Sequence, residues 1–204
     1  MKTKIFKKEE LSTIKEWIKD GKVIAFPTDT VFGLGVLYSD EEALKNLKQA
    51  KLRDGNKPIP MMVKSIEQLE KVAYVDERVK LLADRFMPGA LTLILKRRES
   101  VPAYVSDYKD TIALRIPDDN FVLSLLEEPM LVTSANLSGE TPGKNEHDVL
   151  LQLNGRIDAI VEGEAKRDIP STIVDLSSDK VIILREGEIC ADDINETLTK
   201  GDKR

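Results

Sequence analysis

The sequence predicts an α/β fold with a twisted mixed sheet, partly parallel and partly antiparallel, flanked by helices. Segments of helical periodicity alternate with short runs of β-formers early in the chain, and strands cluster late. The 204 residues are 41% hydrophobic, which suits one compact core, and no linker or repeat divides them. We therefore expect a single domain over residues 1–204.

The helices are expected from apolar stripes and capping residues. Leu11 and Ile14 begin the stripe of the first helix, and Gly21 suits its C-cap. Ser39, with Glu42 three residues later, forms a capping box for the second. Ser65, Asp76 and Asp119 are expected to cap three further helices. The predicted helices cover 8–20, 39–53, segments starting at 65 and 76, 119–127, 146–153 and 192–200.

The stretch 23–35 is the centre of the prediction. Residues 23–26 are apolar and form a strand that Pro27 ends. Short polar side chains follow at 28–30, and Gly33 and Gly35 are expected to allow a tight turn or the close approach of a ligand. The other predicted strands are 61–63, 91–95, 111–116, 130–132, 159–161, 172–176 and 181–184.

Composition excludes several classes of protein. With 31 basic and 36 acidic residues, the net charge of −5 does not indicate a nucleic-acid binder, although a local basic patch stays open as an alternative. No apolar run approaches the length of a membrane span, and the first residues lack the apolar core of a signal peptide. A lone cysteine, Cys190, forms no disulfide within the chain, so we expect a reducing, cytoplasmic compartment and no membrane partner.

Polar side chains stand where several predicted strands end, which is where α/β proteins usually bind small molecules. Arg115 lies between Leu114 and Ile116, so alternation points its guanidinium to the opposite face, and an inward arginine requires an anion. The candidate set is cationic and rich in hydroxyls, which suits a polyphosphate or a carboxylate. It comprises Thr30, Lys51, Arg53, Lys57, Arg115, Ser134, Asn136, Lys144, Ser171 and Arg185.

Other interpretations remain open for single residues. Lys51 and Arg53, taken alone, are explained more simply as partners of a helix dipole. His147 is the only histidine, so a Ser-His-Asp triad and a Cys-His pair are poorly supported, and we expect it at the surface. Cys190 is expected to be a buried apolar residue. No zinc-ligand spacing and no phosphate-binding P-loop is present.

A series of short motifs extends over nearly the whole chain. They are Pro27-Thr-Asp-Thr-Val-Phe-Gly-Leu-Gly35, Lys51-x-Arg53, Pro88-Gly-Ala-Leu-Thr-Leu-Ile-Leu95, Ala113-Leu-Arg-Ile-Pro117, Ser134-Ala-Asn-Leu-Ser-Gly139, Pro170-Ser-Thr-Ile-Val-Asp175 and Leu184-Arg185-Glu-Gly187. In this order they resemble the YrdC/Sua5 family, the threonylcarbamoyl-AMP synthases of tRNA modification.

The resemblance implies a YrdC-like sheet that encloses a deep basic cavity. It implies that ATP, bicarbonate and L-threonine give threonylcarbamoyl-AMP and pyrophosphate, with Mg²⁺ carried by the ATP phosphates and no metal ligand in the protein. The product would supply the t6A modification of adenosine 37 in ANN-decoding tRNAs through a downstream transferase complex.

The resemblance also assigns residues. Threonine contacts fall on Thr30, Arg115, Ser134 and Ser171. ATP contacts fall on Arg53, Lys57, Thr111, Asn136, Lys144 and Arg185. The active-site signature, expected to be catalytic, falls on Lys51, Arg53, Ser134 and Asn136.

Two positions depart from the family pattern, and one alternative function stays open. Phe32 stands where the family usually has tyrosine, and Met62 where some longer relatives have histidine. The alternative is a non-catalytic YrdC/YciO-like protein that binds tRNA or double-stranded RNA. RNA recognition by shape needs a broad basic surface, whereas the net charge and the polar strand ends favour a small ligand.

Overall fold

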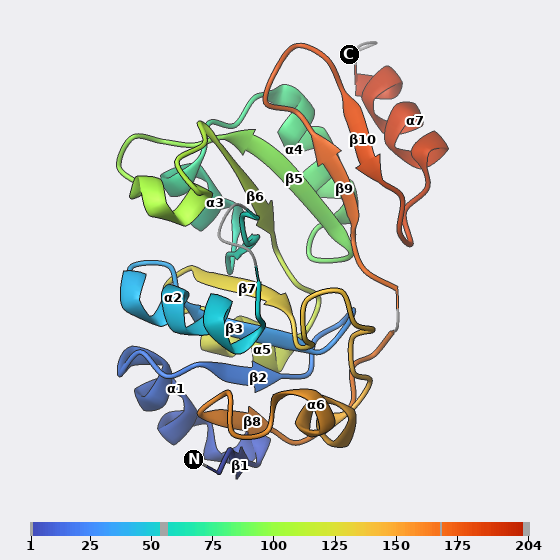
Figure 1. Cartoon of the computed structure of the whole chain (residues 1–204). Helices are drawn as coiled ribbons and strands as arrows, with labels where there is room; N and C mark the ends of the chain where they lie inside the picture. The colour runs from blue at the N-terminus through green and yellow to red at the C-terminus, as the bar shows by residue number, and fades with distance from the viewer. Residues whose placement is uncertain (1, 54–56, 168, 202–204) are drawn as a thin grey trace.

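A computed structural model describes residues 2–53, 57–167 and 169–201. It confirms the α/β class: the described residues form one ten-stranded mixed sheet with helices on both of its faces (Figure 1). The strand order is β1-β8-β2-β3-β7-β4-β6-β5-β9-β10, so the first and last strands of the chain are the two edges.

Most elements lie close to their predicted positions, but the strands Lys4–Phe6 and Gly33–Leu37 and the 3₁₀ turn Ala103–Ser106 were not predicted. The strands are β1 (Lys4–Phe6), β2 (Ile24–Phe26), β3 (Gly33–Leu37), β4 (Met61–Met62), β5 (Leu91–Lys96), β6 (Thr111–Arg115), β7 (Met130–Ser134), β8 (Ala159–Val161), β9 (Thr172–Asp175) and β10 (Ile182–Arg185). The α-helices are α1 (Leu11–Lys19), α2 (Glu41–Ala50), α3 (Ile66–Val72), α4 (Glu77–Phe86), α5 (Asn120–Leu125), α6 (Glu146–Leu153) and α7 (Ala191–Gly201). Short 3₁₀ turns cover η1 (Lys8–Glu10) and η2 (Ala103–Ser106).

Helix starts follow the capping chemistry, with one correction. The caps predicted at Ser65, Asp76 and Asp119 are confirmed, since each side chain accepts a hydrogen bond from a first-turn amide. The prediction that Ser39 caps the second helix is wrong. Asp40 caps α2 instead, and its Oδ1 accepts from a first-turn amide at 2.9 Å, because a carboxylate also complements the positive end of the helix dipole.

The glycines of the central stretch do not form the predicted turn. Gly33 and Gly35 lie inside β3, which pairs antiparallel with β2 and β7. A Cβ atom at Gly33 would lie 3.0 Å from Val132 Cγ1, and one at Gly35 would lie 3.1 Å from a ring carbon of Phe26. A side chain at either position would therefore press on its neighbours in the sheet, and the chain turns between Pro27 and β3. Gly33 also lines the cavity described below.

Two halves of the sheet meet at β4. Figure 1 places β2, β3, β7 and β8 in the lower half and β5, β6, β9 and β10 in the upper half. Only Met61 and Met62 join them in the ladder, by pairing antiparallel with β7 and parallel with β6. The cavity described below is lined by residues of both halves.

The core occupies both faces of the sheet. Ile24 and Phe26 of β2 pack with Ile14 of α1 on one face, while Ala25 belongs to the larger cluster on the other. This alternation is what a strand buried on both sides requires. Among the described residues, no helix has both the length and the apolar character needed to cross a bilayer.

Candidate functional site

A cavity of about 480 Å³ opens between the two halves of the sheet. Its wall brings together most of the predicted site residues from segments far apart in the chain. Those on the wall are Thr30, Arg53, Arg115, Ser134, Asn136, Ser171 and Arg185. A volume of this size is typical of sites for small-molecule ligands.

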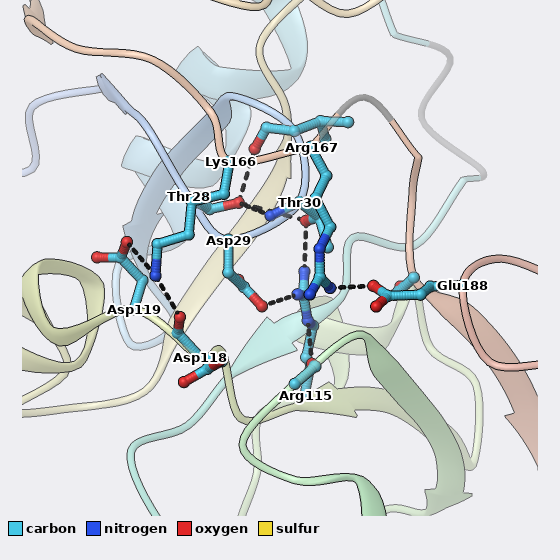
Figure 2. A network of polar contacts seen from close by, with 12 residues as sticks. Thr28, Asp29, Thr30, Arg115, Asp118, Asp119, Lys166, Arg167 and Glu188 are labelled. Atoms are coloured by element: carbon cyan, nitrogen blue, oxygen red, sulfur yellow. Dashed lines mark hydrogen bonds and ion pairs between the residues drawn. The ribbon is translucent and has the colours of Figure 1, made fainter.

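Arg115 is held at the end of β6 by three different groups. Its Nε donates to Gly89 O at 2.9 Å, Nη1 to Thr30 Oγ1 at 2.7 Å and Nη2 to Asp29 Oδ2 at 2.6 Å (Figure 2). Burial lowers the pKa of the Arg115 guanidinium, and the Asp29 carboxylate opposes this shift. The anion that an inward arginine requires is therefore already supplied by the chain itself.

Asp29 was not predicted as a site residue, although the sequence places it between two threonines that were noted. The residue is 2% exposed, and its second oxygen, Oδ1, has no hydrogen-bond partner among the described residues. An aspartate just after an apolar strand is the signal that could have identified it, because a carboxylate that becomes buried there must be paired.

Lys51 lies behind the cavity wall. It is the C-cap of α2, and the residue is 1% exposed. Nζ donates to the backbone oxygens of Ser134 and Asn136, the latter at 2.7 Å, and lies 3.4 Å from Asn136 Oδ1. Burial, reinforced by the charge of Arg53, lowers the pKa of Lys51 to about 7. Lys51 thus supports the turn that carries two wall residues, a role different from that of an exposed helix-dipole partner.

The turn after β7 is also stabilised by one of its own side chains, that of Asn136. Asn136 Nδ2 donates to Leu137 O and Glu140 O, both at 2.7 Å. The backbone amide of Ser138 donates to Lys51 O at 2.8 Å. With these contacts the segment from Ser134 to Asn136 is preorganised, since its backbone oxygens and the Asn136 side chain are already held by the chain.

Arg53 reaches the wall from the segment that follows α2. Its Nε donates to Lys57 O at 3.2 Å and its Nη2 to Pro58 O at 3.1 Å. Burial lowers its pKa, with Asp107 opposing. The residues between Arg53 and Lys57 lie outside the described residues.

Ser171 and Arg185 close the opposite side of the cavity. Arg185 donates to Ser171 O from Nε at 3.0 Å and from Nη2 at 2.8 Å. Thr92 Oγ1 and Ser171 Oγ share a hydrogen bond of 2.7 Å. Thr92 lies on the wall and was missed, although its place inside the apolar strand β5 is the same signal that pointed to Arg115.

A segment before β9 covers the Thr28–Thr30 motif. The amides of Lys166 and Arg167 donate to Thr28 O at 3.0 Å and Thr30 O at 3.1 Å. The Lys166 side chain reaches Asp118 O at 2.8 Å, and the Arg167 side chain pairs with a glutamate after β10, as Figure 2 shows. No pattern in the sequence had singled out this segment.

Several predicted residues lie off the described wall. Lys57 and Lys144 are exposed, and Thr111 is half-buried at the start of β6. Met62 lines the cavity, and Phe32 is fully buried in the core.

The exposure of two residues outside the site, His147 and Cys190, was also predicted. His147 is exposed, as expected. The prediction of a buried Cys190 is wrong: it is half-buried, next to the start of α7, and its thiol donates to Asp193 Oδ2 at 3.0 Å.

The chemistry of the wall is that of an anion site. Three guanidinium groups, from Arg53, Arg115 and Arg185, face a cavity that also presents hydroxyl and amide groups. Such groups bind phosphates and carboxylates through charge-assisted hydrogen bonds. Among the described residues, no three histidine, cysteine or acidic side chains are grouped so that they could hold a metal ion.

Comparisons with known proteins all point to one family. The family model Sua5_yciO_yrdC, described as telomere recombination, matches residues 16–187. Threonylcarbamoyl-AMP synthase of Pyrococcus abyssi is 36% identical over 198 residues, which cover 91% of this chain and 58% of the relative. The protein of the same name from Bacillus subtilis is 37% identical over 188 residues, covering 89% and 54%. The chain thus spans somewhat more than half the length of these two relatives.

Solved structures agree with this fold. Sua5 of P. abyssi, complexed with L-threonine, superposes with a TM-score of 0.89 at 34% identity, over 96% of this chain and 59% of that one. Escherichia coli YciO superposes with a TM-score of 0.85 at 25% identity, over 94% and 99%.

Proposed function

The chain belongs to the Sua5/YciO/YrdC family, and from this we propose that it is a threonylcarbamoyl-AMP synthase. The reaction joins L-threonine, bicarbonate and ATP into threonylcarbamoyl-AMP and pyrophosphate. The observation that carries the proposal is the convergence of hydroxyl groups and three arginines on one cavity of about 480 Å³. A downstream transferase complex would use the product for t6A at adenosine 37 of ANN-decoding tRNAs.

Threonine would bind around Arg115. A guanidinium has five N–H donors, and three contacts to described residues leave capacity for an incoming carboxylate. Thr30, Ser134 and Ser171 lie on the same wall and can meet the polar groups of the ligand. The complex of the P. abyssi relative with L-threonine supports this choice of substrate.

ATP would bind with its phosphates towards Arg53 and Arg185, assisted by Asn136. Lys57, Lys144 and Thr111, which lie off the described wall, would contribute only at the edge of the nucleotide. The donor set fits Mg²⁺ carried by phosphate oxygens and water, because Mg²⁺ usually keeps several waters and the described residues form no carboxylate cage. When bound, the ion would neutralise phosphate charge.

The steps need no covalent intermediate with the protein. The threonine amine and bicarbonate condense to a carbamate with loss of water. A carbamate oxygen then forms a bond to the α-phosphorus of ATP, and the bond from that phosphorus to the bridging oxygen breaks, releasing pyrophosphate. The cavity shields the labile carbamate from bulk water, and the arginines offset the developing charge. Lys51 acts through the turn that holds Ser134 and Asn136.

Pyrophosphate release by the purified chain tests the proposal. Release should require threonine, bicarbonate, ATP and Mg²⁺ together, without tRNA. Ser134→Ala should reduce the rate strongly, while Ser138→Ala, an exposed serine of the same turn, should leave it within about twofold, since surface changes away from the site have little effect. Equal release with and without threonine would remove the assignment.

The same protein can be tested for the alternative function. Thermal unfolding is measured with ATP, threonine and bicarbonate in one series and with duplex RNA in another. A ligand that binds the folded state raises the melting temperature. Stabilisation by duplex RNA alone would favour the RNA-binding alternative.

A further inference from the structure

Asp29 and Arg115 form a buried ion pair beside the cavity, and the steps above give the Asp29 carboxylate no role. Their side chains are 3% and 6% exposed, and 2.6 Å separates Asp29 Oδ2 from Arg115 Nη2. The two opposite charges compensate. The part of the site that Arg115 presents to a ligand therefore carries little net charge of its own.

Two further cations lie near the pair, and one of them, Arg185, has no carboxylate partner among the described residues, since its guanidinium donates to Ser171 O. Arg167 and Arg185 are close enough to lower the pKa of Arg115. The Arg167 side chain, however, is paired with Glu188 (Figure 2). On the carboxylate side, Asp29 Oδ1 is buried and has no hydrogen-bond donor among the described residues. The two charges of the pair therefore cancel, while Asp29 Oδ1 could still accept one hydrogen bond.

We propose that Asp29 sets the ligand preference of the cavity, by neutralising Arg115 so that the site selects a zwitterionic amino acid over a plain carboxylate. The inference rests on the proposed function, because it takes Arg115 as the group that binds the carboxylate of the ligand. The negative charge of Asp29 repels a plain carboxylate placed at Arg115, so such a ligand binds less tightly than it would without that charge. An amino acid brings its own ammonium, which the Asp29 carboxylate attracts. Asp29 acts through the field at Arg115 and is a positioning residue.

Asp29→Asn tests this directly, because the amide has the same shape and can still accept from Arg115 but has no charge. Calorimetry compares the Kd of L-threonine with that of 3-hydroxybutyrate, its analogue without the amino group, at one pH and one salt concentration. The preference for L-threonine should fall about tenfold in the variant, the scale of one close charge interaction in a binding site. If Asp29→Asn only disturbed the structure of the site, both Kd values would rise together and their ratio would stay unchanged.

Asp118→Asn is the matched control. Asp118 lies three residues after Arg115, is exposed, and has only its backbone oxygen in the network, which accepts from Lys166 Nζ. The Asp118→Asn substitution also removes one negative charge near Arg115, but from an exposed position. The ratio of the Kd values for 3-hydroxybutyrate and L-threonine should therefore stay that of the wild type. A ratio that changes equally in both variants would assign the effect to overall charge and overturn the proposal.

Arg115→Gln gives the reciprocal measurement and covers the case in which Asp29→Asn does not fold. With the Asp29 charge uncompensated, L-threoninamide, which has the ammonium but no carboxylate, should bind more tightly than it does to the wild type. No gain for this cation would contradict the proposal. If the wild type binds no L-threonine, the proposed function fails as well. If it binds L-threonine and Asp29→Asn keeps the wild-type ratio, only the inference on Asp29 fails.

Discussion

Two buried cations at the site, Lys51 and Arg115, are stabilised in different ways. Arg115 has a carboxylate partner, whereas the described partners of Lys51 are three oxygens that carry no charge. Three acceptors match the three N–H groups of an ammonium, but burial opposes the charge and lowers the pKa of Lys51 to about 7. Lys51 therefore titrates near neutral pH, where an ordinary lysine remains fully charged.

The first prediction concerns Lys51 and pH. Between pH 7 and 10.5 the unfolded chain holds a proton on Lys51 that the folded chain lacks, so the free energy of unfolding rises with pH over this window and this contribution is flat below pH 7. Lys51→Met should lose this rise, as measured by urea unfolding at pH 7 and pH 9.5. Lys45→Met, an exposed lysine of α2, should keep it. A Lys51→Met variant with the wild-type pH slope would contradict the low pKa.

The second prediction concerns Arg53 and turnover. Arg53→Gln should reduce turnover about 10²–10³-fold, the scale of losing one preorganised donor, because Arg53 lies on the wall. Arg98→Gln is the control, since Arg98 also holds backbone carbonyls, those of Glu70 and Ala73, but lies off the described wall. Steady-state pyrophosphate release measures both. Similar losses in the two variants would mean that tethering of the chain, and not charge at the cavity, explains the effect.

At the scale of elements, β3 packs closely against its neighbouring strands because two of its residues, Gly33 and Gly35, have no side chain. A Cβ atom at Gly35 would lie 3.1 Å from both the ring of Phe26 and the Cε of Met130. Because β3 pairs with both β2 and β7, it cannot move away from either one. The Thr28–Thr30 motif lies directly between β2 and β3, so its position depends on this packing.

The third prediction follows from that packing. Gly35→Ala should lower the free energy of unfolding by about 1–3 kcal/mol, the usual cost of overpacking a core. Phe26→Leu removes ring atoms that the new methyl would meet, so Gly35→Ala should cost less in that background. Chemical denaturation of the two single variants and the double variant measures the coupling. Strict additivity would show that the ring does not limit the space at Gly35.

For the whole molecule, the site depends on how the two halves of the sheet face each other. Thr30 and Ser134 come from the half that contains β2, β3 and β7, whereas Arg115, Ser171 and Arg185 come from the half that contains β6, β9 and β10. The ladder between the halves passes through the two residues of β4. A ligand that contacts both walls therefore couples the halves.

The fourth prediction is a hydrogen-exchange pattern. Threonine with ATP, at about one hundred times the Kd, should stabilise the folded state by about 2.7 kcal/mol and slow exchange in β4 and in the strands on both of its sides. Mass spectrometry of exchanged peptides measures this, with threonine or ATP alone for comparison. Protection confined to one half of the sheet would contradict a ligand site shared by both.

Local chemistry could be predicted from the amino-acid sequence. Caps at Ser65, Asp76 and Asp119, the strands around Pro27 and Pro117, and the unusual position of Arg115 all follow from interactions within a few residues. The family resemblance could also be predicted, because the motifs and their order along the chain can be read without knowing the fold.

What those side chains meet depends on the tertiary fold. Gly33 and Gly35 lie in a strand, where Phe26 and Val132 approach them from neighbouring strands. Arg115 pairs with Asp29, 86 residues earlier in the chain, and Lys51 reaches backbone oxygens 83 and 85 residues later. Contacts over such separations depend on strand order and register, which local propensity does not encode. The same register determines which of the predicted cations reach the cavity and which, like Lys51, support it from behind.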